Sequence, residues 1–286
     1  MLRRRSILAA GVAAILACGV LAAGSGGAGG RAAFDSGGAW SLVVRVLGYG
    51  PRPAGSAAER QVAEVLRQRL PGGRFEAVPG GLRNVVGGLP GREPAIVVAA
   101  HYDTTPVAGY VGANNSAAGV AAVVEVARAL GRDPLRAGDR AVRFALFDGE
   151  EAPAGFTDFY AEGDRGSKAY VAAHRSATRE LVLLDFIANR NLRIPREAGS
   201  EPALWSRLRA AAASVGAGGA FPAATRPLIF DDHTPFRLAA IPAIDLIDFD
   251  YPCWQKRCDT LARISRSSLA ASGRTVLALV RAERSR

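Results

Sequence analysis

Hydrophobic and polar positions along the chain follow two periods in turn. A continuous apolar run at residues 95–100 and a largely apolar stretch with bulky side chains at residues 142–147 are typical of buried strands, and the first is typical of a sheet covered on both faces. Between them, after a small-residue turn at residues 109–119, apolar positions recur three and four apart and predict a helix ending at Leu130. Further strands are expected at residues 75–78, 84–87, 180–187 and 241–246, and further helices at 40–47, 56–70, 167–174, 200–213 and 265–283. This alternation predicts a three-layer α/β sandwich with a mostly parallel central sheet and helices on both faces.

The strongest chemical signal follows the apolar run at residues 142–147. Asp148 and Gly149 break the run, and two carboxylates, Glu150 and Glu151, come next. In an open α/β sheet, ligands bind beyond the carboxyl ends of the strands. Past a strand end, side chains need not alternate between faces, so one carboxylate can hold a cation while the other moves protons in the same pocket. A solvated loop with two surface glutamates is the simpler alternative.

Polar residues close two other expected strands. His101 follows residues 95–100, and Asp103 can fix the tautomer and orientation of a metal-bound His101. Taken alone, a histidine at a strand end is more often structural. Asp185 stands near the end of residues 180–187, and His233 is expected to orient neighbouring aspartates or to cap its short helix.

The composition fits one exported domain. With 286 residues and 49% hydrophobic content, the chain can bury a full core in a domain of roughly 250 residues. The net charge of +10 comes mostly from scattered arginines, without the clustering and interleaved aromatics of a nucleic-acid surface. We therefore expect no nucleic-acid partner. We also expect the protein to be a monomer.

The amino terminus has the pattern of a targeting segment. Arg3, Arg4 and Arg5 precede an apolar run that ends near residue 24, and a Gly/Ala/Ser spacer is expected over residues 25–38. The first 24 residues fit a twin-arginine signal, a lipoprotein signal with Cys18 acylated, or an uncleaved membrane anchor. Under each interpretation the domain at residues 39–286 is exported, either secreted or attached to the outer face of the cytoplasmic membrane, and only this segment contacts the membrane.

Two further cysteines, Cys253 and Cys258, lie in one loop. In an oxidising compartment, a disulfide closing that loop is favoured over two separate buried thiols.

Several short motifs follow one another along the chain, namely His101-Tyr-Asp103, Gly112-Ala-Asn-Asn115-Ser, Phe147-Asp-Gly-Glu-Glu151, Leu184-Asp185 and Asp231-Asp-His233. In this order they resemble the zinc-dependent exopeptidase family of bacterial aminopeptidases and glutaminyl-peptide cyclotransferases. The resemblance runs from about residue 50 to the end of the chain. It is closest to the cyclotransferase-like branch, where Trp254 matches an aromatic of the substrate pocket. It implies a fold of zinc-exopeptidase type.

The resemblance also implies a role for each matched residue. Glu150 stands at the position of the general acid/base, and Glu151 at that of a carboxylate zinc ligand. Asp185 and Asp231 match acidic residues that share protons with the acid/base or bind a second ion, and His101 matches a ligand of that second ion. The implied activity is hydrolysis or cyclisation at the amino termini of peptides or proteins, with zinc as the cofactor.

Two substitutions alter the implied zinc site. Asn115 stands where the family has an aspartate ligand, and Gln255 stands where it has a histidine ligand. Amide oxygens are neutral and weaker donors than carboxylate or imidazole. Lys256 and Arg257 would add repulsion if they faced the site. We therefore predict that zinc occupancy is low and that zinc-dependent catalysis is weakened or lost.

Three hypotheses follow. The chain is a peptide-binding module that keeps the pocket without metal catalysis, or it is an enzyme whose metal lies one position over, at His101, Asp185 and Glu150 or Glu151. The third hypothesis is an exported scaffold domain without a ligand. Clustered carboxylates strain a fold unless something compensates them, and this argues against the third hypothesis.

Overall fold

The computed structural model of the protein describes residues 31–286. The targeting segment expected over residues 1–24, with Cys18, lies outside the described residues, as does the first part of the expected spacer. Within residues 31–286, no helix combines the length and the apolar character needed to cross a membrane.

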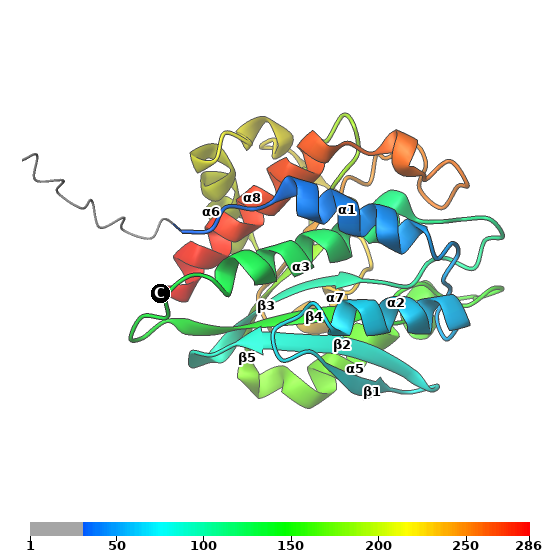
Figure 1. Ribbon diagram of the computed structural model, residues 1–286, viewed down its shortest axis with the longest axis horizontal. Helices are drawn as coiled ribbons and strands as arrows, with labels where there is room; N and C mark the ends of the chain where they lie inside the picture. The colour runs from blue at the N-terminus through cyan, green and yellow to red at the C-terminus, as the bar shows by residue number, and fades with distance from the viewer. Residues whose placement is uncertain (1–30) are drawn as a thin grey trace, which may run out of the picture. The chain divides into compact units, whose positions relative to one another are not determined.

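A six-stranded sheet forms the centre of the domain, with the strand order β1-β2-β4-β3-β5-β8 (Figure 1). The four strands β4, β3, β5 and β8 run parallel, and β2 and β1 are added antiparallel at one edge. The α/β class with a mostly parallel sheet is therefore confirmed. The strands are β1 (Arg74–Val78), β2 (Leu82–Leu89), β3 (Arg92–His101), β4 (Arg140–Phe147), β5 (Thr178–Leu184) and β8 (Ala243–Leu246), with a separate two-residue pair β6 (Arg196–Glu197) and β7 (Thr225–Arg226).

Helices cover both faces of the sheet. The helices on one face are α1 (Ser36–Leu47), α2 (Ala57–Arg67), α3 (Gly119–Leu130), α6 (Pro202–Ser214) and α8 (Arg266–Arg284), and those on the other are α5 (Arg165–His174) and α7 (Thr234–Leu238) (Figure 1). Shorter turns are η1 (Ala113–Ala118), α4 (Phe159–Glu162), η2 (Arg175–Ala177), η3 (Gly218–Ala220) and η4 (Leu261–Arg263).

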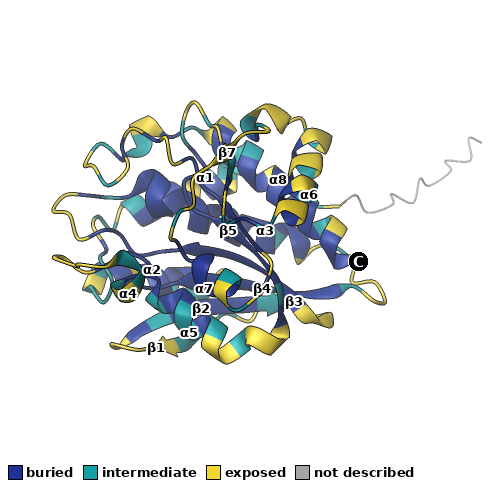
Figure 2. Ribbon diagram, turned by 180° about the vertical axis from the view of Figure 1, so that it is seen from behind, coloured by how far each residue is buried: buried dark blue, intermediate teal, exposed yellow. Residues whose placement is uncertain are grey.

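The helices on both faces of the sheet explain why its central strands are largely apolar. Along β3, Val98 and Ala100 pack with α1, α3 and α8, whereas Val97 and Ala99 pack with α5 and α7. Successive side chains of a strand point to opposite faces, so a strand with helices on both sides needs apolar residues at every position. Figure 2 shows the central strands buried and the exposed residues gathered on outer helices and loops.

The domain begins earlier than the sequence indicated. Phe34 is buried in the main core, where Gly273 of α8 leaves room for its ring. Asp35 caps α1 by accepting hydrogen bonds from the backbone N–H groups of Gly37 and Gly38. The expected spacer at residues 25–38 is therefore too long at its carboxyl end. Gly37 and Gly38 lie in the first turn of this capped helix.

Candidate functional site

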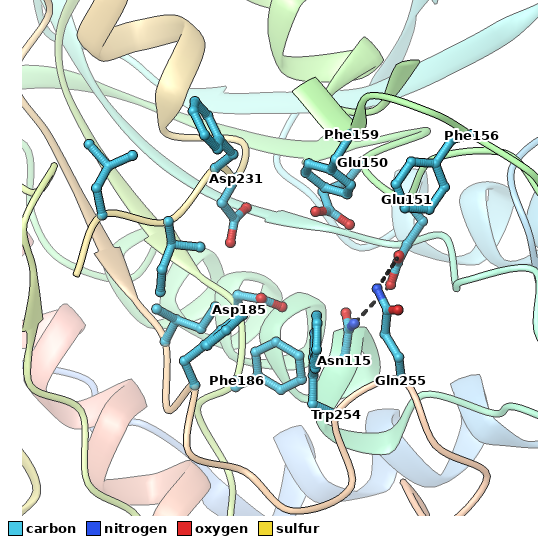
Figure 3. Close-up of a pocket in the computed structure, with 15 residues that line it drawn as sticks. Asn115, Glu150, Glu151, Phe156, Phe159, Asp185, Phe186, Asp231, Trp254 and Gln255 are labelled. Atoms are coloured by element: carbon cyan, nitrogen blue, oxygen red, sulfur yellow. Dashed lines mark hydrogen bonds between the residues drawn. The ribbon is translucent and has the colours of Figure 1, made fainter. Parts of the chain in front are cut away.

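A pocket of about 320 Å³ lies beyond the carboxyl ends of the parallel strands, at the place the sequence indicated. Its acidic part is formed by Glu150, Glu151, Asp185 and Asp231 (Figure 3). The other lining residues are the amides Asn115 and Gln255 and the apolar residues Phe156, Phe159, Phe186, Leu228, Ile229, Phe230, Ile247, Phe249 and Trp254. The expected catalytic, zinc-position and substrate-pocket residues thus meet in one cavity, and His101 lies buried beneath it.

The carboxyl end of β4 is shaped by Asp103. The backbone N–H groups of Glu150 and Glu151 donate to its two carboxylate oxygens at 3.3 and 3.2 Å. The Nδ1 atom of His101 lies 3.3 Å from the same carboxylate. Gly149 turns the chain with φ +71°, a conformation that side-chain-bearing residues rarely adopt. Asp103 therefore orients His101, as the sequence indicated, and also fixes the loop that carries both glutamates.

Asp185 is the first residue beyond β5. The expected strand at residues 180–187 ends at Leu184, and the chain turns because the N–H of Ile187 donates back to the carbonyl of Asp185. The turn leaves the Asp185 side chain directed into the pocket (Figure 3).

The turn that carries Asn115 is held by a buried arginine outside the expected set. Arg52 is fully buried and donates to the carbonyls of Tyr102, Val111 and Gly112 at 3.0, 2.6 and 3.2 Å. These bonds satisfy carbonyl groups that would otherwise be buried without a partner. Arg52 could not be identified from the sequence, because its partners are more than 45 residues away in the chain.

Asp259 fixes the same turn from the opposite side. Its carboxylate accepts hydrogen bonds from the backbone N–H groups of Asn114 and Asn115 and from the hydroxyls of Tyr110 and Tyr251. Asp259 follows the loop in which Cys253 and Cys258 form a disulfide. The loop carrying Gln255 and the turn carrying Asn115 are thereby joined, and Asp259 was also missed from the sequence.

At the zinc position that the resemblance implied, the three residues converge on one another. Asn115 donates from Nδ2 to Glu151 Oε1 at 2.9 Å, and Gln255 donates from Nε2 to Glu151 Oε2 at 3.4 Å (Figure 3). When Glu151 is ionised, turning either amide over would place its oxygen against a carboxylate oxygen, which is repulsive without a cation between them. Both oxygens of Glu151 therefore accept N–H groups.

This donor set does not fit a zinc ion. Glu151 is the sole anionic side chain of the three, and zinc in proteins is held mainly by thiolate, imidazole and carboxylate groups. A zinc ion at this position would have to displace the N–H groups of Asn115 and Gln255 from Glu151. Lys256 is not among the residues that line the pocket, and its Nζ donates to the carbonyl of Pro252 at 3.0 Å.

His101 is surrounded by carboxylates. Its Nε2 lies 3.3 Å from Asp185, and its Nδ1 lies 3.3 Å from Asp103 and 3.7 Å from Glu150. Burial alone would lower the pKa of His101, but Glu150, Asp103 and Asp185 together raise that pKa well above its ordinary value. A protonated imidazole cannot bind a metal, so an ion at the position of His101 and Asp185 would first have to displace a proton.

Three carboxyl groups of the pocket, those of Glu150, Glu151 and Asp231, have raised pKa values. Burial, reinforced by neighbouring carboxylates, raises the pKa of Glu151 to about 8, that of Asp231 to about 7, and that of Glu150 well above its ordinary range. Removing a carboxylate from water disfavours its charged form, and each nearby negative charge adds to that effect. The cluster is therefore suited to bind cations or to exchange protons.

His233 has a different environment from the one expected. It stands at the first position before α7, but its side chain makes no cap hydrogen bond. It is fully buried instead, with Nε2 3.3 Å from Glu197 and Nδ1 3.8 Å from Asp245. The capping role is therefore wrong, because these two buried carboxylates attract the imidazole away from the helix end. Neither Glu197 nor Asp245 was identified from the sequence.

Comparison with known proteins agrees with this geometry. The profile of Peptidase family M28 matches residues 84–280, which is more than half of the chain. No curated protein sequence gives a significant match.

Solved structures share the fold over most of the chain. A leucine aminopeptidase precursor from Bacteroides thetaiotaomicron is 25% identical, with a TM-score of 0.78, and the match covers 88% of this chain and 98% of that one. A glutaminyl cyclase from Porphyromonas gingivalis is also 25% identical, with a TM-score of 0.78 and coverage of 87% and 99%. A Zn-dependent exopeptidase from Parabacteroides distasonis is 23% identical, with a TM-score of 0.75, and the match covers 88% of this chain and 99% of that one. At this identity the match shows a shared fold.

Proposed function

The chain belongs to Peptidase family M28, and on that premise we propose that it binds the amino termini of peptides with its zinc-dependent catalysis weakened or lost. One observation supports the weakening or loss of zinc-dependent catalysis. Both carboxylate oxygens of Glu151 accept hydrogen bonds from the amides of Asn115 and Gln255, at the position where the family resemblance implies zinc.

The chemistry of the pocket supports a peptide amino terminus as the ligand. The carboxyl groups of Asp185 and Asp231 line the pocket and can accept hydrogen bonds from an α-ammonium group (Figure 3). Phe186, Phe249 and Trp254 form an apolar wall that suits the first side chain of a peptide. Trp254 packs on Phe249 with ring centroids 5.0 Å apart and remains 42% exposed, so it can close over a ligand at the mouth. Related structures described as an aminopeptidase and a glutaminyl cyclase support the same ligand class.

The proposal predicts binding without turnover. A fluorescent peptide with a free amino terminus and an apolar first residue is expected to bind, and its Nα-acetylated form is expected to bind at least about tenfold more weakly, because the acetyl group removes the positive charge. Neither Gln-initiated peptides nor aminoacyl dyes are expected to be converted. Fluorescence polarisation and product analysis measure the two properties.

Two variants make this test specific. Asp231→Asn should weaken binding of the free peptide by about tenfold. Asp250→Asn alters a 65% exposed carboxyl in the loop that carries Phe249 and should change little. Equal binding of the free and acetylated peptides would contradict the ligand assignment, and efficient turnover would contradict the loss of catalysis.

A second candidate is a metal-dependent enzyme whose ion lies at His101 and Asp185. It is favoured by the Oδ1 atom of Asn115, which is buried and has no hydrogen-bond partner among the described residues. The carboxylates on both sides of His101 argue against it, because they favour the protonated ring. His101→Gln would remove one bound ion per chain if this candidate were correct.

We also propose that the domain works outside the cytoplasm as a monomer. The disulfide between Cys253 and Cys258 supports an oxidising compartment. The basic and apolar segment at residues 1–24 supports export, with residues 25–30 as the remaining spacer.

A further inference from the structure

A second cluster of carboxylates lies on the side of Glu150 that faces away from Glu151. Glu150, Asp164 and Asp231 each offer one oxygen atom, and these three atoms lie within 4.8 Å of one another. The residues come from the loop after β4, the start of α5 and the turn before α7. All three are buried, and Figure 3 shows Glu150 and Asp231 directed toward each other.

The backbone fixes Asp164 beside Glu150. The N–H of Asp164 donates to the carbonyl of Glu150 at 2.9 Å, and the N–H of Arg165 donates to the carbonyl of Gly149 at 3.0 Å. These two hydrogen bonds connect the loop after β4 to the first residues of α5. The position of the Asp164 carboxylate is therefore set by the fold.

The side chain of Asp164 is not used by its own helix. Asp164 occupies the N-cap position of α5, where an aspartate ordinarily accepts a hydrogen bond from a backbone N–H of the first turn. Its side chain makes no such bond, and both carboxylate oxygens are buried without a hydrogen-bond partner among residues 31–286. A buried carboxylate without a partner is costly, so this group requires a ligand that supplies positive charge or a proton.

Nearby cationic side chains do not satisfy the cluster. Arg165, the residue after Asp164, donates to the carbonyls of Gly149 and Glu151, and Lys168 directs its Nζ to the carbonyls of Tyr160 and Gly163. His101 lies 3.7 Å from Glu150 but also contacts Asp103 and Asp185, and it makes no ion pair with Asp164 or Asp231 among the described residues. Asp232 adds a further buried carboxylate whose two oxygens also have no partner among the described residues.

We propose that Glu150, Asp164 and Asp231 bind one hard divalent cation of the Mg²⁺, Mn²⁺ or Ca²⁺ class. Carboxylate oxygens without imidazole or thiolate favour these ions over zinc. Ligands on opposite sides of a calcium ion are about 4.6–5.2 Å apart, since each bond is about 2.3–2.6 Å long, so the cluster needs little contraction. The ion joins the loop after β4 to α5 and to the turn before α7.

This site is distinct from the two positions discussed above. It uses neither Glu151 nor His101; it shares Glu150 with the alternative metal position and Asp231 with the proposed peptide pocket, and Asp164 belongs to it alone. With the cation bound, Glu150 is a ligand, so it is no longer free to act as a general base. The inference therefore agrees with lost catalysis but does not depend on peptide binding.

Titration of the purified chain with Mn²⁺ tests the proposal, by calorimetry and by the loss of the free-ion electron paramagnetic resonance signal. We expect one Mn²⁺ per chain, and about tenfold or greater loss of affinity in Asp164→Asn. The matched control is Glu162→Gln, which alters a carboxyl two residues away that bonds to Thr157 and not to the cluster. Glu162→Gln should retain the Mn²⁺ affinity of the unmodified chain, and His101→Gln, which removes a ring 3.7 Å from Glu150, should not weaken that affinity.

A thermal measurement separates loss of the site from loss of the fold. Without metal, Asp164→Asn should melt at a higher temperature than the unmodified chain, because it removes a buried repulsive charge. Adding Mn²⁺ should raise the melting temperature of the unmodified chain but not that of Asp164→Asn. The proposal is overturned if no Mn²⁺ binds, if Asp164→Asn binds as tightly as the unmodified chain, or if His101→Gln alone abolishes binding.

Discussion

Replacing Asn115 by aspartate and Gln255 by histidine in one variant is expected to raise the affinity for zinc by at least about 100-fold. Both amides now donate N–H groups to Glu151, at 2.9 and 3.4 Å. The double variant replaces them with a carboxylate and an imidazole directed at the same point, so the site gains a negative charge and a nitrogen ligand. Competition with a chromophoric zinc chelator measures the change.

A triple variant is the control for this measurement. Adding Glu151→Gln to Asn115→Asp and Gln255→His removes the residue on which both side chains converge, and the gain in zinc affinity should disappear. Asn115→Asp alone should give an intermediate affinity, since the imidazole is still missing. If the double variant bound zinc no better than the unmodified chain, the three residues would not form a latent zinc site.

The free energy of unfolding is expected to fall as the pH rises from about 4 to about 8 when no divalent cation is present. Burial raises the pKa of Asp148 and of Asp231 to about 7 and that of Glu151 to about 8, while the unfolded chain titrates these groups near pH 4. Between these values the folded state binds more protons than the unfolded state. Stability is therefore highest below the unfolded pKa values and is lost as the pH rises through the folded ones.

Each group that contributes fully gives a slope of about 1.4 kcal/mol per pH unit. The raised pKa of His101 acts in the same direction, because stability from a raised histidine pKa is present below its unfolded value and is lost at higher pH. Urea unfolding at several pH values, with a chelator present, measures the slope. The Asp148→Asn variant, which keeps an oxygen acceptor for the N–H of Arg83, should flatten the slope. Stability that rises between pH 5 and pH 8 would contradict the proton retention inferred for these groups.

The sequence predicted those parts of the site that strand ends determine. Largely apolar stretches located β3, β4 and β5, and the polar residues at the ends of these strands share one edge of the sheet because parallel strands end there. His101, Glu150 and Asp185 were found in this way. Asn115 and Gln255 lie in loops, and their positions were expected from the family resemblance.

The residues that could not be predicted from the sequence are placed by contacts between distant segments of the chain. Asp164 lies in a glycine-containing loop with no motif, and its position beside Glu150 depends on backbone hydrogen bonds that form only after folding. Arg52 and Asp259 act on the turn of Asn115 from far along the chain. Phe34 and Asp35 were assigned to a spacer because flanking glycines concealed a helix cap.

Zinc titration of the unmodified protein against a competing chelator tests the central claim most directly. If the amides of Asn115 and Gln255 have taken the place of zinc on Glu151, the dissociation constant for zinc at this position should be larger than about 1 µM. After dialysis, the protein should retain no zinc whose binding depends on Glu151. One zinc ion per chain, bound with nanomolar affinity and lost in Glu151→Gln, would contradict the account.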